Sequence, residues 1–321
     1  MPIFFRLLLL WLSIPGISMA MSTSTRKRAL PLSSLSDAGG RIELFFKSET
    51  ELKERILFLR SSGMSSFNLV NKNKKDTSDV WIDLIRELHP EAHVSAHYSL
   101  KHNKVSRKEI EHHKELLIQS FESSNADEIL LISGSGDKKA WNTVYALRAL
   151  QKMLDQGQSH PKIAVAYNPY FLSDIDQERE NQRLLQKLAT GCISKIYLQF
   201  GTDIDRLQKG LEFIATNKNH DIKVAGSLFL PTKQLIAQQK FRPWNGVFLS
   251  TSFLNGPEEA TAIVSEIIRV YKRNEVELLW EAPGIRTEKD LSILRDLLHA
   301  AGVSASTGEH NNVTPKKACG S

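Results

Sequence analysis

Several polar side chains of this sequence stand within or directly after short apolar runs, where buried strands are expected. Glu43 lies between Ile42 and Leu44. A carboxyl group inside an apolar strand must be paired, protonated or turned into a cavity, because burying it alone is costly. Its pKa would tend to rise, which suits a general acid. Glu43 is therefore a candidate catalytic acid, with a structural salt bridge as the alternative.

Other candidates occupy similar places further along the chain. His97 ends a third run, Tyr167 and Asn168 end a fifth, and Gln199 lies within a sixth. An inward glutamine needs partners for its amide, which a substrate or a hydrogen-bonded plug could supply. Asp137 follows the fourth run in "ISGSGD", which lacks the Gly-Lys-Ser/Thr of a P-loop and the third glycine of GxGxxG. Asp137 could thus face a ligand or only cap the next helix.

The apolar runs that position these residues alternate with amphipathic helical patterns from residue 41 onward. They cover 41–46, 65–71, 92–98, 127–133, 162–167, 194–200, 222–229 and 276–282. Alternation of this kind predicts an α/β fold with a parallel sheet, and the number of runs favours a (β/α)₈ TIM barrel. A doubly wound open sheet is the alternative. A ninth run, "GVFLSTSF" (246–253), fits either an extra strand or an irregular or helical segment between the seventh and eighth strands.

The barrel pattern is expected to form a single domain over residues 41–302. Residues 303–321 are polar and are expected to be disordered. Residues 1–40 are expected to be a targeting leader, because an apolar stretch ending in Ser18-Met19-Ala20 precedes a Ser/Thr- and Arg/Lys-rich segment. Import into a plastid by the secretory route is favoured. A mitochondrial leader, secretion, and a cytoplasmic protein starting at Met21 are the alternatives.

Composition excludes some classes of function. Four of the 42 basic residues lie in residues 1–36, which contain no acid, so the net charge of +6 comes mainly from the leader. We therefore expect no nucleic-acid partner. The apolar stretch of the leader is short for a membrane span, and none is expected in the mature chain. The two cysteines, Cys192 and Cys319, offer neither a disulfide framework nor a metal-ligand spacing, so no metal is predicted.

Taken in order, the polar positions resemble the methylenetetrahydrofolate reductase family, whose members are flavoproteins on a (β/α)₈ barrel. "IELFF" resembles the family's first-strand FEFFPP, "VSAHYSL" its segment with HLTC, and "ILLISGSGD" its LRGD segment. "KIAVAYNPYF" resembles VAAYPE, and "ENQRLLQKLATGCISKIYLQF" resembles DLxxLKRKVDAGAxxxITQ. The resemblance extends over roughly residues 41–302.

The resemblance implies that NAD(P)H reduces bound FAD, which reduces the folate-type substrate 5,10-methylenetetrahydrofolate. Glu43 would protonate the substrate nitrogen, Asp137 would face the flavin, and Gln199 would bind the pterin. The implied cofactor-binding residues are His97, Asp137, Tyr167, Asn168, Glu180 and Lys187. A homo-oligomer is possible.

Departures from the family concentrate at its flavin contacts. Ser135 replaces the arginine of LRGD, and "LVNKN" replaces a segment whose threonine contacts flavin. A divergent barrel that has lost FAD and binds a folate or a partner protein is therefore the alternative. An unrelated lyase or aldolase, with Lys195 or Lys223 as the Schiff-base residue, is a third possibility.

Overall fold

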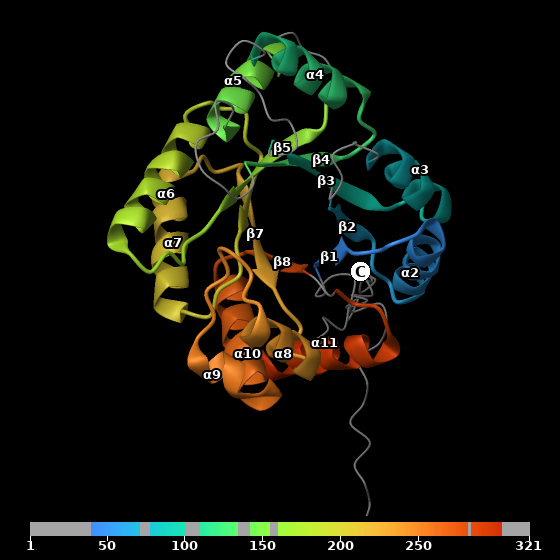
Figure 1. The fold of residues 1–321 in the computed structure, drawn as a ribbon, viewed down its shortest axis with the longest axis vertical. Helices are drawn as coiled ribbons and strands as arrows, with labels where there is room; N and C mark the ends of the chain where they lie inside the picture. The colour runs from blue at the N-terminus through green and yellow to red at the C-terminus, as the bar shows by residue number, and fades with distance from the viewer. Residues whose placement is uncertain are drawn as a thin grey trace, which may run out of the picture.

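The fold is a closed barrel of parallel strands in the order β1-β2-β3-β4-β5-β6-β7-β8, ringed by helices (Figure 1). The structure is a computed structural model that describes residues 40–70, 78–100, 110–133, 142–154, 160–281 and 284–303. β1 pairs with β8 to close the ring, and every pairing is parallel. The predicted (β/α)₈ barrel is confirmed, and an open doubly wound sheet is excluded.

Each strand falls within or close to its predicted run. The strands are β1 (Arg41–Leu44), β2 (Ser66–Leu69), β3 (His93–Ser99), β4 (Glu128–Ile132), β5 (Lys162–Tyr167), β6 (Lys195–Leu198), β7 (Lys223–Leu228) and β8 (Glu277–Trp280). The leader, apart from Gly40, and the tail after Val303 lie outside the described residues, so the predictions for them stay predictions.

Helices follow the strands around the ring. They are α2 (Glu49–Ser61), α3 (Ser78–Leu88), α4 (Ile110–Ser123), α5 (Thr143–Leu154), α6 (Asp174–Leu188), α7 (Ile204–Asn217), α8 (Lys233–Phe241), α9 (Thr251–Asn255), α10 (Pro257–Arg273) and α11 (Glu288–Ala300). The connection from β7 to β8 holds α8, α9 and α10. The ninth apolar run lies there, as an irregular segment with one bridge, Gly201 to Phe248, followed by α9. None of the described helices has the length and apolar character that a bilayer crossing requires.

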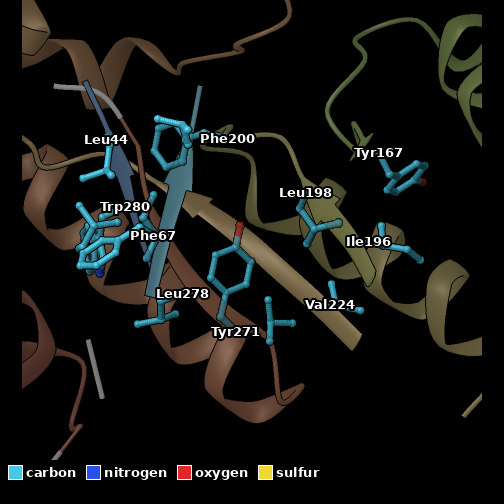
Figure 2. Close-up of a cluster of buried hydrophobic side chains, with 14 of the residues drawn as sticks. Leu44, Phe67, Tyr167, Ile196, Leu198, Phe200, Val224, Tyr271, Leu278 and Trp280 are labelled. Atoms are coloured by element: carbon cyan, nitrogen blue, oxygen red, sulfur yellow. The ribbon is translucent and has the colours of Figure 1, made fainter. Parts of the chain in front are cut away.

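Alternation along the strands builds two buried layers. Residues such as Ile42, Leu44 and Phe67 point outward and pack against the helices, and Figure 2 shows members of this layer. Inside the barrel a smaller apolar cluster fills the middle. Its members are Leu130, Ala164, Tyr197, Ala225 and Leu279. The two alanines leave space for the Tyr197 ring, so the middle of the barrel is packed.

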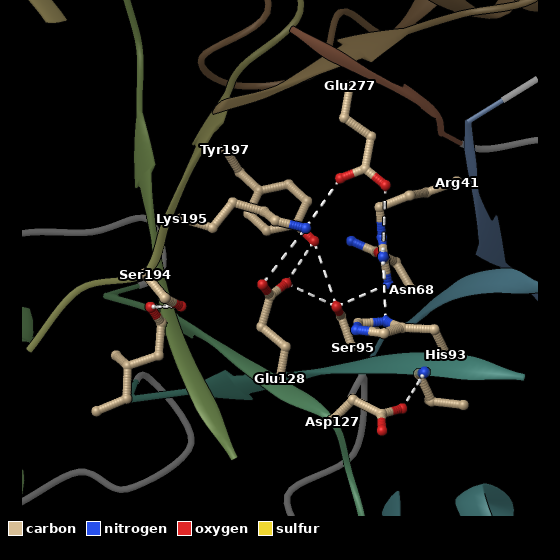
Figure 3. Close-up of polar contacts among 12 residues, drawn as sticks. Arg41, Asn68, His93, Ser95, Asp127, Glu128, Ser194, Lys195, Tyr197 and Glu277 are labelled. Carbon is tan, nitrogen blue, oxygen red and sulfur yellow. Dashed lines mark hydrogen bonds and ion pairs between the residues drawn. The ribbon is translucent and has the colours of Figure 1, made fainter. Parts of the chain in front are cut away.

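The amino-terminal end of the barrel is closed by charged side chains (Figure 3). Arg41, His93, Glu128, Lys195 and Glu277 are each the first residue of their strand. Lys195 Nζ lies 2.8 Å from a carboxylate oxygen of Glu277 and 3.5 Å from one of Glu128, and Arg41 lies 3.6 Å from Glu277. Two cations thus meet two carboxylates at one end of the interior.

Neutral partners complete this cluster, which we call the basal charge network. Arg41 donates to Asn68 (2.7 Å) and Ser95 (2.8 Å), while Ser95 and Tyr197 donate to Glu128 at 2.7 and 2.6 Å. Burial alone would raise the pKa of Glu128, but Lys195 and these hydrogen bonds outweigh burial and lower it. Burial lowers the pKa of His93, as does Arg41, so His93 is neutral. The network therefore compensates its own charges.

Candidate active site at the mouth of the barrel

A pocket of about 440 Å³ opens at the carboxyl-terminal end of the strands, where (β/α)₈ enzymes hold their active sites. Glu43 of β1 and Glu281, directly after β8, bring two carboxyl groups into it. Its other lining residues are Phe45, Gln199, Phe229, Gln238, Trp244, Asn245 and Val247. The pocket thus combines an acidic pair, aromatic walls and neutral amides.

The Glu43 carboxyl group opposes the ionisation of Glu281. Burial raises the pKa of Glu281 to about 8, and the negative charge of Glu43 contributes to the rise. A hydrogen bond from Ser227 acts in the opposite direction. Burial and a nearby carboxylate both disfavour the ionised form of Glu281, so Glu281 is the member of the pair that holds a proton more readily. A retained proton beside a carboxylate is what general acid–base catalysis needs.

Ser227 holds Glu281 in place from the neighbouring strand. Its hydroxyl, which is almost fully buried, donates to Glu281 Oε1 at 2.5 Å. The backbone oxygen of Ser227 in turn accepts from the Tyr271 hydroxyl of α10 at 3.3 Å. The Tyr271 ring lies so close to Gly226 that a Cβ there would be 2.2 Å from a ring carbon. The helix layer therefore supports the strand that positions Glu281.

The two aromatic residues Phe229 and Trp244 of the pocket wall belong to the connection that follows β7. The rings of Phe229 and Trp244 meet edge to face, with centroids 5.3 Å apart. The backbone N–H of Trp244 donates to Gln239 at 3.2 Å, and Asn168 Nδ2 donates to the oxygen of Gly246 at 2.9 Å. These contacts fix the segment that carries Trp244 over the pocket.

The structure brings together two of the residues predicted from sequence, Glu43 and Gln199. The Gln199 side-chain oxygen accepts from the backbone N–H of Phe200 at 2.9 Å, which orients its amide. His97 is buried in β3 opposite Leu130 and is not among the residues lining the pocket. Asp137 lies outside the described residues, so its predicted role stays a prediction.

The residues predicted to hold flavin engage the protein itself. The Tyr167 hydroxyl donates to Asn181 at 2.7 Å, and its ring stacks on Phe213 outside the barrel. Lys187 Nζ donates to the backbone oxygen of Ala166 at 2.7 Å beneath α6. Burial lowers the pKa of Lys187, an effect that Glu180 opposes.

The remaining members of that set are similarly engaged. Glu180 pairs with Arg183 of the same helix at 3.1 Å, and both ends of the Asn168 amide bond to backbone groups, of Gly246 and Tyr170. Tyr167, Asn168, Glu180 and Lys187 therefore do not gather around the mouth pocket. In the described part of the chain, the residues do not fit a flavin site of the predicted kind.

Sequence reasoning missed Glu281, although the signal was present. Glu277, Leu279 and Glu281 alternate along the last strand run, so all three share the face that points into the barrel. The sequence alone does not reveal the basal charge network either, because it suggests for Lys195 only a Schiff-base role. The structure pairs Lys195 with Glu128 and Glu277 at the opposite end of the barrel from the pocket. Lys223, the other Schiff-base candidate, is exposed at the first position of β7. Within the described ranges, no group of three or more potential ligands could hold a metal ion.

Replacing Ser227 with alanine is expected to raise the pKa of Glu281 by about one further pH unit, because the lost hydrogen bond favours the ionised form. Trp244 lines the same pocket, so its fluorescence against pH reports the titration. The Trp244→Phe variant shows which part of the fluorescence change comes from Trp244. Ser265→Ala, at a buried serine of α10, is the matched control. An unchanged midpoint in Ser227→Ala would show that the hydroxyl does not act on Glu281.

Comparisons with known proteins give weak structural similarities. No protein-family model and no curated protein sequence matches the chain. An aldo-keto reductase from Klebsiella pneumoniae, solved in complex with NADPH, is similar at 11% identity and a TM-score of 0.48 over 83% of this chain and 86% of that one. KGPDC from Streptococcus mutans is similar at 13% identity and a TM-score of 0.38, over 71% of this chain and 97% of that one. The chitinase ICChI from Ipomoea carnea is similar at 10% identity and a TM-score of 0.43, over 80% of this chain and 97% of that one. Similarity at this level says nothing about function.

Proposed function

We propose that the chain is an enzyme that performs general acid–base catalysis in the mouth pocket, with Glu43 and Glu281 as the proton-transferring pair. The observation that carries this proposal is the pair itself, which combines two carboxyl groups from β1 and the end of β8 in one aromatic pocket. A carboxyl group with a raised pKa in a cleft is a common mark of a catalytic site. The charge compensation at the other end of the barrel is structural and involves neither residue.

The roles within the pair follow from their contacts. Ser227 donates to Glu281 Oε1, so the other oxygen of Glu281 is the one available to hold and deliver a proton. Glu43 is the carboxylate that accepts a proton or stabilises positive charge developing on the substrate. Phe229 and Trp244 place aromatic surface beside the pair, with their rings edge to face.

The resemblance seen in the sequence suggests a substrate for this chemistry, a folate that carries a one-carbon unit. In 5,10-methylenetetrahydrofolate, a proton from the carboxyl pair would go to a ring nitrogen. The bond from that nitrogen to the methylene carbon would break, and its electron pair would stay on the nitrogen. The location of Glu43 and Gln199 in one pocket supports this substrate. The flavin-dependent reduction by NAD(P)H stays a prediction, and no step through flavin is derived.

A second candidate is a binding barrel without flavin, acting on a folate or a partner protein. The contacts of Tyr167, Asn168 and Lys187 with the protein itself favour it. The purified full chain distinguishes the candidates. A yellow chromophore, or a melting temperature raised by added FAD, would support the reductase. Binding of 5-methyltetrahydrofolate without any reaction would support the binding barrel.

The proposed proton transfer has its own test, because opening the folate ring allows its methylene carbon to exchange with ¹³C-labelled formaldehyde. We expect the wild-type chain to accelerate this exchange without flavin, and Glu43→Gln and Glu281→Gln to lower the acceleration about 100-fold. Glu178→Gln, at an exposed position of α6, is the control and should retain it. No acceleration by the wild-type chain, or equal rates in all the variants, would refute proton transfer to this substrate.

A further inference from the structure

We infer that Asn168 is a positioning residue of the mouth pocket, which latches a short segment of chain over the pocket and thereby controls the access of water and ligand. The segment is residues 242–248, between α8 and α9, and we call it the Trp244 strap. The inference deepens the proposed function by adding a means of closing the same site, and it rests on the mouth pocket being that site. It gives Asn168 a role that does not involve flavin.

The Trp244 strap supplies part of the pocket wall. Trp244, Asn245 and Val247 all line the pocket, as does Glu281. The strap bends in a turn in which the backbone N–H of Val247 donates to the backbone oxygen of Trp244 at 3.2 Å. The third residue of this turn, Gly246, has a φ of 82°, which glycine adopts without strain. The tip of the strap is therefore a preformed turn.

A side-chain hydrogen bond from the opposite side of the mouth holds this tip. Asn168 Nδ2 donates to the backbone oxygen of Gly246 at 2.9 Å. The oxygen of the same amide accepts from the backbone N–H of Tyr170 at 3.0 Å, so the loop after β5 fixes the direction in which the amide faces. Because this second bond lies within the loop, the donor keeps its direction when the strap moves away.

The two ends of the strap are anchored through the backbone. At one end, the backbone N–H of Thr202 donates to the backbone oxygen of Phe248 at 3.1 Å, and the N–H of Ser250 donates to the Thr202 hydroxyl at 2.6 Å. At the other end, the N–H of Arg242 donates to the backbone oxygen of Gln238 at 2.7 Å, where α8 ends. A segment with fixed ends and a tip held by a side chain can swing at its tip while its ends stay in place.

A buried amide beside the strap indicates that the strap has a second position. Gln239 is 2% exposed, and its side-chain oxygen accepts from the backbone N–H of Trp244 at 3.2 Å. In the described part of the chain, the Nε2 of Gln239 is buried without a hydrogen-bond partner. A buried donor without an acceptor costs free energy, and a swing that brings a backbone oxygen to Gln239 would remove this cost. The Asn168 latch and the contact of Trp244 with the Phe229 ring favour the closed position instead.

Acrylamide quenching of Trp244 fluorescence in the full chain tests the latch. Asn168→Asp keeps the shape of the side chain and the oxygen that faces Tyr170, but an oxygen replaces the donor to Gly246. We expect the quenching constant of Trp244, obtained from the fluorescence that Trp244→Phe removes, to rise roughly twofold in this variant because the strap opens locally. Amide hydrogen exchange followed by mass spectrometry should become faster in the peptide covering 242–248 and stay unchanged in β8.

The titration of Glu281 gives a second readout, which an asparagine with a merely structural role would not change. Burial is the main cause of the raised pKa of Glu281, so water admitted by an open strap should lower that pKa. Asn168→Ser adds no titratable group, and its shorter side chain still accepts from Tyr170 but does not reach Gly246. We expect the midpoint, followed by Trp244 fluorescence, to fall by about half a pH unit or more.

Asn274→Asp is the matched control. Asn274 Nδ2 also donates to a backbone oxygen at 2.9 Å, that of Val270, but it does so at the carboxyl-terminal end of α10, shortly before β8 begins. This variant should leave the quenching, the exchange of the strap and the midpoint unchanged. Wild-type quenching and exchange in a folded Asn168→Asp chain would overturn the inference, and so would equal effects of the control. Melting curves show whether each variant is folded, and Asn168→Ser provides the same measurements if Asn168→Asp does not fold.

These outcomes separate the latch from the proposed catalysis. Quenching and amide hydrogen exchange need no substrate. A strap released in the Asn168 variants, without formaldehyde exchange by the wild-type chain, would support the latch and contradict the folate reaction. Formaldehyde exchange by the wild-type chain, with an unaltered strap in both Asn168 variants, would support the reaction and overturn the latch.

Discussion

Replacing Glu128 with glutamine is expected to lower the free energy of unfolding by about 3 to 5 kcal/mol, the range for removing one member of a buried ion pair. Glu128 is 1% exposed and is the carboxylate on which Lys195, Ser95 and Tyr197 converge. Glutamine keeps the shape and an acceptor oxygen, so the loss measures mainly the charge. Chemical denaturation of the wild-type and variant chains gives the difference.

Glu277→Gln is the matched control, because Glu277 contacts the same Lys195 but is 33% exposed. We expect it to cost about 1 kcal/mol or less, since water screens this pair. The pH dependence provides a second check. The pKa of Glu128 is lowered in the folded chain, so its stabilisation is present above the pKa of the unfolded state and is lost as pH falls through the folded value. The variant should lose less stability in acid than the wild type. Equal losses for the two substitutions would contradict the buried network.

Replacing Gly226 with alanine is expected to destabilise the barrel by about 1 to 3 kcal/mol through overpacking. The new Cβ would lie 2.2 Å from a ring carbon of Tyr271, which is fully buried in α10. β7 pairs with β6 and β8, so its backbone cannot easily move away from the ring. The ring must shift instead, which disturbs the contact between Tyr271 and Ser227.

Thermal denaturation measures the loss of stability, and the fluorescence of Trp244 against pH shows whether the titration of Glu281 changes with it. Gly256→Ala is a suitable control, because Gly256 is extended and its nearest neighbour is the mobile carboxylate of Glu259 at 3.3 Å. We expect this control to be close to neutral. A Gly226→Ala chain as stable as the wild type would show that α10 does not press on β7.

The fold could be predicted because its signal is local and repeated. Each strand of a barrel covered by helices is a short apolar run, and each helix shows its own period, so a single sequence reveals their alternation. The segment 246–253 is the exception. Val247 and Phe248 look like strand residues because they pack against the core, although the chain there makes only an isolated bridge. A buried irregular segment and a buried strand both appear in the sequence as a short apolar run, so the sequence alone does not distinguish them.

The site could be predicted only in part, because it depends on side chains that are distant in sequence. Glu43 stood out as an acid within an apolar run, and Gln199 as an amide within another. Their partner Glu281 lies near the end of the run 276–282, but its proximity to Glu43 becomes visible only when β8 pairs with β1. Lys187 matches a family position in sequence, but a sequence match does not show in which direction the helix points the side chain. α6 directs its amine beneath the helix toward Ala166.

The packed interior of the barrel has a consequence for turnover. Between the mouth pocket and the basal charge network lies the apolar layer of Leu130, Tyr197 and Leu279, each at most 4% exposed. Among the described residues, this layer closes the inner end of the pocket, so the barrel offers no passage from the pocket to the basal charge network. For the proposed enzyme, substrate and product would then enter and leave on the mouth side.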